Sequence, residues 1–400
     1  MVREIIISIY LLLFKCLFAL CNLLPLKNKV TFVVSFGDNS KYVYQEMCNQ
    51  KIPFETVFLC KGLSKRHFLS YRNIKLLTFE SINVIDTCKS IYHLATSKYI
   101  IIDNYFGFLA VTNFKHDVEC IQLWHAAGAI KKFGLEDQSI GTRSKRANER
   151  FLQVYEKFHK VVVGSDAMAA IFKNAFNLDD QNILRTGIPR SDFFYDVKLR
   201  NDIILQLISE NEDIKYKKVI LYAPTFRDGQ LDQFKLHLDI EKMYHKLRDH
   251  YIVLLRLHPA VKNTTDFGKN YPGFVYDYSS PKVNINELLL VTDILISDYS
   301  SIPYEFSLLN KPMIFFAYDL LQYKKERGLW DDFQEIVPGP VVYNTEEIIN
   351  IILENKFDLE KIKEFSKKWN KYSKGKSSEN LVHYLFMEEK MLNLDQQKAL

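Results

Sequence analysis

Three segments of the sequence place a chemically reactive side chain at the end of an apolar run: His125, His258 and 298–301. In open α/β sheets, ligands bind at the carboxyl ends of the strands. If these runs are strands, the reactive side chains gather at such edges. We therefore predict a site that is built from strand ends.

The first segment is QLWHAAGAIKKFGLED, residues 122–137. Histidine titrates near neutrality, so His125 could take a proton from an attacking hydroxyl. Lys131 and Lys132 lie one to two turns further along and could hold diphosphate oxygens. On residue chemistry alone, the plainer interpretation is a loop histidine that bonds a backbone carbonyl, and it stays open.

The second segment is RLHPA, residues 256–260. Pro259 ends the strand and fixes the backbone beside His258. Arg256 alternates with His258 and so faces the same side, which offers two donors to one anionic ligand. A strand-end histidine that caps a loop is the alternative.

The third segment, residues 292–316, carries the strongest pattern. A strand ends at Asp298, and a helix begins near Pro303, since proline favours the first turn. Ser300 and Ser301 would lie at the helix N-terminus, where N–H groups and the helix dipole favour a phosphate. Plain capping by Ser301, with Glu305 completing a capping box, is compatible with that role.

Two arginines complete the set of candidates. Arg227 stands just after a strand in APTFRD, and Arg190 stands in TGIPRSDFF, together with Asp192. Each pattern is weak alone, because arginines after strands are usually solvated. Together with the three segments above, they indicate convergence on one site.

The elements that must position these residues form two successive β/α series. Nearly continuous apolar runs are typical of parallel strands that are covered on both faces. Such runs occur at 30–36, 56–60, 98–103, 118–123 and 160–164, and again at 218–224, 251–257, 293–298 and 312–316. Helical patterns lie between them, for example at 84–95, 145–156 and 166–176. This order predicts two doubly wound domains with a cleft between them, and a helical end, 358–392, that braces the first domain.

Composition excludes several classes of function. The hydrophobic content of 48% and charged content of 25% are those of a globular protein. A net charge of +5 is too small for a nucleic-acid surface but suits an anionic membrane or a phosphate-rich substrate. The six cysteines lack metal-ligand spacing, so we expect no metal site and reduced thiols in the cytoplasm. The sequence has no glycine-rich phosphate loop.

The N-terminal run, residues 5–26, is almost wholly apolar but contains Lys15 near its middle. A charge there is costly inside a bilayer, and no cleavage site follows the run. We predict an apolar helix at the membrane interface. A transmembrane anchor and a first helix that packs on the protein are the alternatives.

Several motifs together now carry a family resemblance. The motifs are WHAAGAIKKFG, TGIPRSD, ILYAPTFRD, RLHPA, ISDYSSIPYEF and NKPMIFFAYDLLQYKKERGL. In order and spacing, residues 98–375 resemble the CDP-glycerol glycerophosphotransferase family of wall teichoic acid synthesis. The polymerase branches typically have WHG-x-P-L-K, whereas this chain has Ala126 and no proline. The segment is therefore most similar to the primase branch.

The resemblance implies an α/β fold of two Rossmann-like domains, similar to glycosyltransferase-B enzymes. The expected parts are a membrane-associating helix (1–27), an acceptor domain (28–200), a CDP-glycerol-binding domain (201–375) and a C-terminal helix (376–400).

The implied reaction is transfer of the first glycerol phosphate from CDP-glycerol to undecaprenyl-diphosphate-linked N-acetylmannosaminyl-N-acetylglucosamine, with release of CMP. The expected location is the cytoplasmic side of the cell membrane, as a peripheral protein of a Gram-positive cell, where other teichoic acid synthesis enzymes are candidate partners. No nucleic acid is expected as a partner.

The resemblance also implies roles for the candidate residues. His125 would be the general base on the acceptor hydroxyl, and His258 would act on the donor. Binding of substrate would fall to Lys131, Lys132, Arg190, Arg227, Arg256, Asp298, Ser300 and Ser301. Within this set, Asp298 is expected to orient its neighbours, because a carboxylate beside phosphates is repelled. Glu305, Asp319 and Arg327 match motif positions with structural or nucleotide-positioning roles.

Rival functions remain. One is a polymerising glycerol- or ribitol-phosphate transferase of the same family. Another is a sugar-nucleotide epimerase on the same fold, which the hydrophobic N-terminus disfavours. A third is a non-catalytic membrane scaffold of a polymer-synthesis complex. No cofactor is expected, and Mg²⁺ bound with the donor diphosphate is left open.

Overall fold

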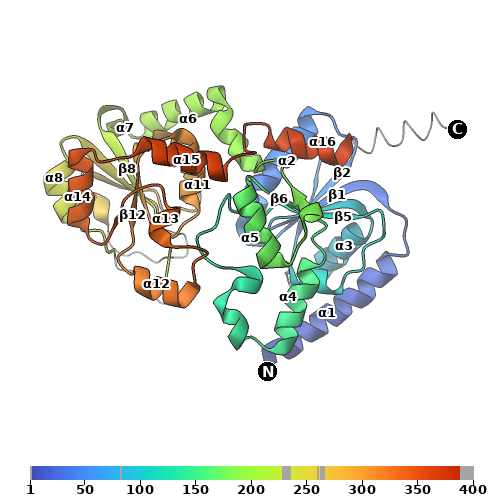
Figure 1. The fold of residues 1–400 in the computed structure, drawn as a ribbon. Coiled ribbons are helices and arrows are strands. Elements are labelled where there is room, and N and C mark those ends of the chain that lie inside the picture. Colours follow the sequence, from blue (N-terminus) through green and yellow to red (C-terminus); the bar gives the residue numbers. More distant parts are fainter. Residues whose placement is uncertain (1, 82, 228–235, 259–260, 262–265, 388–400) are drawn as a thin grey trace. The chain divides into compact units, whose positions relative to one another are not determined.

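Two parallel β-sheets, each flanked by helices, form the two compact units of the chain (Figure 1). The structure is a computed structural model that describes residues 2–81, 83–227, 236–258, 261 and 266–387. Unit 1 comprises residues 1–127, 133–192 and 371–400, and unit 2 comprises residues 128–132 and 193–370. The α/β class and the two parallel sheets predicted from the apolar runs are confirmed.

Unit 1 contains a seven-stranded sheet with the order β3-β2-β1-β4-β5-β6-β7. Every pairing in it is parallel, and the strand order reverses between β1 and β4. Its strands are β1 (Lys27–Val34), β2 (Glu55–Cys60), β3 (Lys75–Thr78), β4 (Ser97–Ile102), β5 (Glu119–Gln122), β6 (Lys160–Val162) and β7 (Ile183–Leu184). The β-branched and aromatic side chains of β1 and β4 are buried, as expected for strands covered on both faces.

Helices cover both faces of this sheet. They are α1 (Val2–Cys21), α2 (Asp38–Asn49), α3 (Val84–Ala95), α4 (Lys145–Tyr155), α5 (Asp166–Phe176) and α16 (Ser377–Phe386). Short 3₁₀ turns, among them η2 (Gly107–Val111), connect the elements. The three helices predicted at 84–95, 145–156 and 166–176 are confirmed to within one residue.

Unit 2 contains a six-stranded parallel sheet with the order β10-β9-β8-β11-β12-β13. The order reverses between β8 and β11. Its strands are β8 (Lys218–Tyr222), β9 (Tyr251–Leu255), β10 (Val275–Asp277), β11 (Ile294–Ser297), β12 (Met313–Phe316) and β13 (Val341–Val342). Its helices are α6 (Val197–Glu210), α7 (Asp213–Tyr216), α8 (Ile240–Leu247), α9 (Phe267–Asn270), α10 (Ile285–Val291), α11 (Ile302–Phe306), α12 (Leu320–Arg327), α13 (Phe333–Ile336), α14 (Thr345–Glu354) and α15 (Leu359–Trp369).

The boundaries between the units differ from the predicted ones. The chain leaves unit 1 after Asp192 rather than after residue 200, and it returns at Lys371 rather than ending as a separate helix. In addition, residues 128–132 belong to unit 2 although the sequence around them belongs to unit 1. Local periodicity predicts elements but carries no information on such exchanges.

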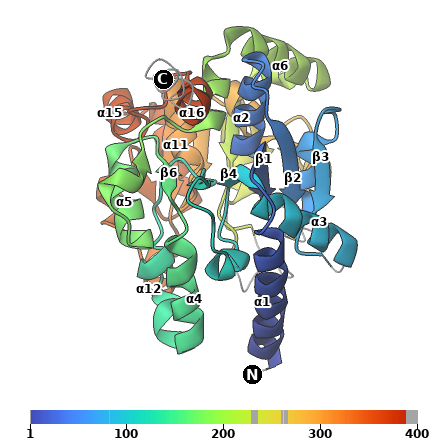
Figure 2. The same ribbon diagram turned by 90° about the vertical axis from the view of Figure 1, so that its right-hand side faces the viewer.

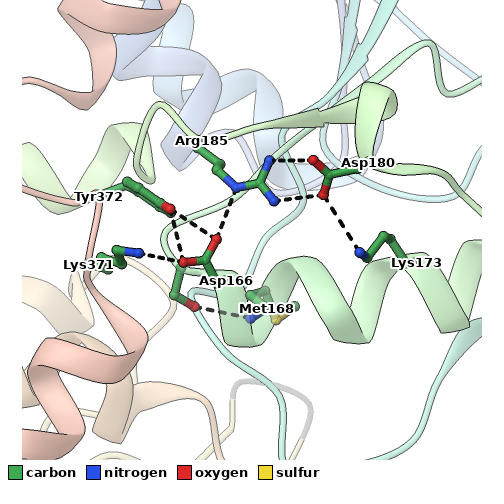
Figure 3. A network of polar contacts seen from close by, with 8 residues as sticks. Asp166, Met168, Lys173, Asp180, Arg185, Lys371 and Tyr372 are labelled. Carbon is green, nitrogen blue, oxygen red and sulfur yellow. Dashed lines mark hydrogen bonds and ion pairs between the residues drawn. The ribbon is translucent and has the colours of Figure 1, made fainter.

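The returning chain is tied to the start of α5 by a polar network (Figure 3). The carboxylate of Asp166 accepts bonds from Lys371 at 2.6 Å, from Tyr372 at 2.9 Å and from Arg185 at 3.0 Å. Arg185 also bonds Asp180. Hydrogen bonds from Lys371 and Arg185 lower the pKa of the Asp166 carboxyl below its usual range. From this anchor the chain continues into α16 in unit 1. The prediction that 358–392 braces the first domain therefore holds for α16, whereas α15 belongs to unit 2 and residues 388–392 lie outside the described part of the chain.

The N-terminal helix α1 packs on unit 1 with one face only (Figure 2). Phe14 and Phe18 are each 2% exposed, and the Phe14 ring lies 5.2 Å from that of Phe108 in η2. Burial of one such ring stabilises by about 1.5–3 kcal/mol, so the helix is docked rather than loose. The opposite face is apolar and exposed: Ile5, Ile6, Ile9, Leu12, Leu13 and Leu20. Residues 4–21, with mean hydropathy 2.2, are long and apolar enough to span a membrane, which for a single N-terminal helix is weak evidence.

Candidate functional site

In unit 1, the loop after β5 holds Trp124 in a left-handed conformation, with φ of 57°. Such a backbone is uncommon for a bulky residue and persists only where its surroundings fix it. The Trp124 N–H donates to Gln122 Oε1 at 2.9 Å, and its carbonyl accepts from Asn39 Nδ2 at 2.9 Å. The indole packs among the rings of Phe133, Phe172 and Phe176. The next residue, His125, is therefore presented by a fixed backbone.

The imidazole of His125 has a defined tautomer. Its Nδ1 lies 3.3 Å from the backbone carbonyl of Asp103, and a carbonyl can only accept a hydrogen bond. In the neutral ring this contact places the proton on Nδ1 and makes Nε2 the basic nitrogen. The ring stacks on Phe36 at 4.0 Å and on Trp124 at 4.4 Å. A neutral histidine held in this way can accept a proton at Nε2.

Arg190 lies beside the same loop. Its Nη1 donates to the backbone carbonyl of His125 at 2.8 Å, and its own N–H donates to Asn39 Oδ1 at 3.0 Å. The side chain is 9% exposed. The structure thus brings Arg190 to His125, where its described bonds hold the loop.

Asp103, which the sequence interpretation did not single out, organises the carboxyl ends of β1 and β4. Its carboxylate accepts the backbone N–H groups of Ser35, Phe36 and Gly37 at 2.8, 2.9 and 2.8 Å. Burial raises its pKa to about 6, although these three bonds act in the opposite direction. An apolar strand that ends in aspartate, the same pattern that marked Asp298, was the available indication.

Lys131 and Lys132 belong to unit 2, not to the unit that carries His125. Lys131 forms an antiparallel bridge with Leu329, and the N–H of Lys132 donates to the Gly328 carbonyl at 3.1 Å. Gly128 begins this segment, and a Cβ there would lie 2.3 Å from the Tyr304 ring, so only glycine fits. The WHAAGAIKK motif is therefore divided between the two units.

His258 follows β9 and lies within electrostatic reach of Lys131. Burial lowers the pKa of His258, and the charges of Arg256 and Lys131 lower it further. The imidazole packs against the Phe226 ring at 4.4 Å. The structure thus brings together His258 and a lysine that stands far from it in the sequence.

Arg256 donates hydrogen bonds to three backbone carbonyls. Its Nη1 donates to the carbonyls of Tyr278 and Ser280 at 3.1 and 2.9 Å, and its Nη2 donates to the carbonyl of Val283 at 3.0 Å. These bonds fix the loop between β10 and α10. The predicted contact with a diphosphate stays a prediction beside this observed structural role.

Arg227 forms a buried cluster with two carboxylates. Its Nε and Nη2 bond both oxygens of Asp319 at 2.7 and 3.0 Å, and Nη2 also bonds Asp298 at 3.1 Å. Burial lowers the pKa of Arg227, but the bond to Asp319 and the charge of Asp298 outweigh it and hold the pKa above its usual range. The guanidinium also lies over the rings of Tyr299 and Tyr323.

Asp298 is 2% exposed, and its carboxylate bonds other groups of the protein. Its carboxylate accepts the N–H groups of Thr225 and Tyr299 at 2.8 and 2.7 Å, besides Arg227. Burial raises its pKa, against the effect of Arg227 and Thr225. This geometry agrees with the expected organising role, and a direct contact with substrate stays a prediction.

Ser300 and Ser301 precede α11, a helix of five residues. The Ser300 hydroxyl accepts the N–H of Ile302 at 3.2 Å, whereas the Ser301 side chain forms no capping bond. The capping box considered for Ser301 and Glu305 is therefore wrong. Ser300 takes the capping contact because Ser301 has helical dihedral angles.

The candidates thus form two groups. His125 and Arg190 lie together in unit 1, and the remaining candidates belong to unit 2, six of them on the loops after β8, β9 and β11. Among the residues that the structure describes, no group of three or more His, Cys, Asp or Glu side chains could hold a metal ion. The assigned roles stay predictions.

Known proteins share this architecture of two doubly wound units with polar strand ends. A family model described as CDP-Glycerol:Poly(glycerophosphate) glycerophosphotransferase matches residues 17–387. The chain belongs to this family.

Three relatives illustrate the similarity. The teichoic acid glycerol-phosphate primase of Bacillus subtilis (strain 168) is 37% identical over 96% of this chain and 98% of its own length. The teichoic acid poly(ribitol-phosphate) polymerase of Bacillus spizizenii is 36% identical over 92% of this chain but only 58% of its own length. A solved structure of the wall teichoic acid polymerase TagF has a TM-score of 0.79 at 22% identity, and the match covers 98% of this chain and 99% of that one.

Proposed function

We propose that this protein adds the first glycerol phosphate from CDP-glycerol to undecaprenyl-diphosphate-linked N-acetylmannosaminyl-N-acetylglucosamine, releasing CMP, in wall teichoic acid synthesis. The observation that carries the proposal is the fixed tautomer of His125, which provides a base for an acceptor hydroxyl. The similarity to a teichoic acid glycerol-phosphate primase over 96% of this chain supports a priming addition. The two units then serve as the acceptor and donor domains of a glycosyltransferase-B-like enzyme.

The reaction is a direct displacement at phosphorus. The acceptor hydroxyl forms a bond to the phosphorus that bears glycerol, the bond to the CMP oxygen breaks, and Nε2 of His125 takes the hydroxyl proton. Catalysis then consists of positioning, proton removal and neutralisation of charge. One positioned base contributes about 10²–10⁴-fold.

Unit 2 supplies the donor contacts in this proposal. Lys131 and His258 lie within electrostatic reach of one another and would face the diphosphate, with Ser300 and Ser301 as hydroxyl donors. Bound phosphate raises the pKa of His258 and so strengthens its hydrogen bond. The Arg227 cluster holds the strand ends beneath these groups.

Full activity in the presence of EDTA would show that Mg²⁺ is dispensable.

The polymerase is the second candidate, because a polymerising relative is nearly as similar as the primase. The decisive assay incubates the full-length protein with radiolabelled CDP-glycerol and a synthetic lipid-linked disaccharide. A single addition supports the primase, and a ladder of products would assign the protein to the polymerases. No incorporation into either product would contradict both.

We further propose that the protein binds peripherally to the cytoplasmic side of the membrane, and the exposed apolar face of α1 supports a contact with a membrane. Val84 and Ile85, at the start of α3, which packs against α1, are also exposed. Replacement of Ile9, Leu12 and Leu13 by glutamine should abolish sedimentation with anionic vesicles. Leu205→Gln, which changes an exposed leucine of α6 in unit 2, is the matched control. Undiminished sedimentation of the triple variant would exclude α1 as the contact.

A further inference from the structure

The loop that presents His125 is held by two side chains from distant parts of the sequence. Trp124 has left-handed backbone angles, which a bulky residue keeps only where its surroundings enforce them. Its carbonyl accepts from Asn39 Nδ2 at 2.9 Å, and the carbonyl of His125 accepts from Arg190 Nη1 at 2.8 Å. Two successive carbonyls of this loop therefore each receive a side-chain donor.

Asn39 and Arg190 are also bonded to each other. The N–H of Arg190 donates to Asn39 Oδ1 at 3.0 Å, so one amide side chain joins two loops of unit 1. A carbonyl only accepts and an N–H only donates, so the two partners of Asn39 fix which end of its amide faces each of them. The two residues are 3% and 9% exposed, which leaves little of either surface open to a ligand. We call Asn39 and Arg190 the clamp.

Each member of the clamp is anchored in its own element. The asparagine lies in the first turn of α2, and the arginine lies in the 3₁₀ turn η6 (Pro189–Tyr195). In the same 3₁₀ turn, Asp192 accepts the N–H groups of Ser377 and Ser378 at 2.8 Å each. These two serines begin α16, so the segment that carries the arginine is tied to that helix. The clamp thus fixes the loop after β5 against α2 and η6.

The imidazole of His125 depends on this backbone for its position. The contact of its Nδ1 with the carbonyl of Asp103 is 3.3 Å long, at the weak end of hydrogen-bond distances. Stacking on Phe36 and Trp124 sets the plane of the ring but lets it slide within that plane. A general base must lie within hydrogen-bond reach of the proton it takes, and a misplacement of about 1 Å can cost about 10²-fold in rate. The reach of Nε2 therefore follows the backbone that the clamp holds.

We infer that Asn39 and Arg190 are positioning residues of the transferase, which act on the reaction only through His125. This gives Arg190 a different role from the substrate contact that the family resemblance implies. It also gives a role to Asn39, which the sequence interpretation did not single out. The inference rests on the proposed function, because it requires His125 to be the base.

The first test is steady-state transfer from radiolabelled CDP-glycerol to the lipid-linked disaccharide. Asn39→Asp keeps the acceptor for Arg190 but replaces the donor to the Trp124 carbonyl with a second oxygen. Arg190→Met keeps much of the side-chain volume and removes every donor. We expect each variant to lower kcat about 10- to 100-fold and to leave the KM for CDP-glycerol unchanged.

The same two changes are then made in the His125→Ala protein. A residue that acts only through His125 has no further effect once the imidazole is gone, whereas a residue that contacts substrate still lowers the residual rate. We therefore expect Asn39→Asp and Arg190→Met to leave the residual turnover of His125→Ala unaltered.

A second readout needs no activity. Free neutral histidine favours the proton on Nε2, so an Nδ1 proton on His125 reports its contact with the Asp103 carbonyl. In protein that carries isotope-labelled histidine, the ring nitrogen shifts should show the Nδ1 form in the parent protein and a gain of the Nε2 form in both variants. His125→Gln identifies the resonances, and unchanged resonances of the other histidines show that a variant is folded.

The chain offers a matched control for each residue of the clamp. Asn182 Nδ2 donates to the His159 carbonyl at 3.0 Å, and its Oδ1 accepts the N–H of Asp179 at 3.1 Å, so Asn182→Asp removes the same kind of bond elsewhere in unit 1. Arg200 Nη1 donates to the Phe194 carbonyl in unit 2, so Arg200→Met is the control for the arginine. Both controls should keep the kcat and the His125 tautomer of the parent protein.

Unchanged kcat in either clamp variant would overturn the inference. A further loss of turnover in the His125→Ala protein would overturn it too, as would an unaltered His125 tautomer. Failure of the proposed function has a different result. His125→Ala would then keep near-normal turnover, or the parent protein would add nothing to the disaccharide, while the tautomer would still change in both clamp variants.

Discussion

The switch points of the two sheets are built alike but differ in charge. In unit 1, Asp103 follows β4 and bonds the loop after β1. In unit 2, Asp298 follows β11 and bonds Thr225 in the loop after β8. Asp103 holds three neutral N–H groups on that loop, whereas Asp298 also holds the guanidinium of Arg227.

This difference separates two tasks. The edge of unit 1 carries His125, whose Nδ1 lies against a backbone carbonyl, as the proposed removal of a hydroxyl proton at Nε2 requires. The edge of unit 2 carries Lys131 near His258, which suits a diphosphate. We therefore propose that unit 1 removes the proton and that unit 2 neutralises the charge.

The largest effect is expected at the base. His125→Ala removes the only proton acceptor assigned to the acceptor hydroxyl, so turnover should fall by about 10²–10⁴-fold. Steady-state transfer from labelled CDP-glycerol measures it, with His116→Ala, a change at a fully exposed histidine of unit 1, as the control. Near-normal turnover would remove His125 from the chemistry.

The two aspartates should differ in their contribution to stability. Asp298→Asn leaves a buried arginine with one carboxylate fewer, and breaking such a pair costs up to about 3–5 kcal/mol. Asp103→Asn weakens bonds to neutral donors, at about 1–3 kcal/mol. Urea unfolding of both variants gives the two free energies. A larger loss of unfolding free energy in Asp103→Asn than in Asp298→Asn would contradict the proposed difference in charge between the two edges.

Lys131→Gln should change the titration of His258. Removal of a nearby cation relieves one of the effects that lower this pKa, so the pKa of His258 should rise. NMR titration of the imidazole protons measures it, with His258→Gln identifying the resonance. Lys89→Gln, a change in an exposed lysine of unit 1, should leave the titration unaltered. An unchanged pKa of His258 in the Lys131→Gln variant would show that Lys131 does not act on His258.

The smallest effect concerns His93, in unit 1 but outside its candidate site. Burial and the charge of Lys29, whose Nζ lies 3.3 Å from Nδ1, lower its pKa to about 4. The unfolded chain takes up this proton near pH 6.5, so the free energy of unfolding should fall as the pH drops from about 6.5 to about 4. His93→Gln should remove this dependence, as urea unfolding at several pH values would show. An unchanged slope would place the acid sensitivity elsewhere.

Much of the fold could be predicted from the sequence because parallel strands are apolar along their whole length. All nine predicted strands exist, within three residues at either end. The strands that were missed, β3, β7, β10 and β13, have two to four residues each and lie at or next to sheet edges, where apolar runs are too short to detect.

The candidate site could be predicted only in part. Strand-end positions identified His125, His258 and Asp298, but not Asp103, whose importance lies in three backbone bonds. The pairing of Lys131 with His258 depends on residues 128–132 crossing to the other unit. Such a crossing depends on tertiary packing, such as Gly128 against Tyr304, and leaves no periodic pattern.

The most direct test of the division between the units is calorimetric binding of CDP-glycerol to the full-length His125→Ala and His258→Ala variants. We expect parent-like affinity for His125→Ala. For His258→Ala we expect a loss of about tenfold or more, the usual cost of removing a hydrogen bond to a charged group. Parent-like donor affinity in His258→Ala, or an equal loss in both variants, would contradict this division.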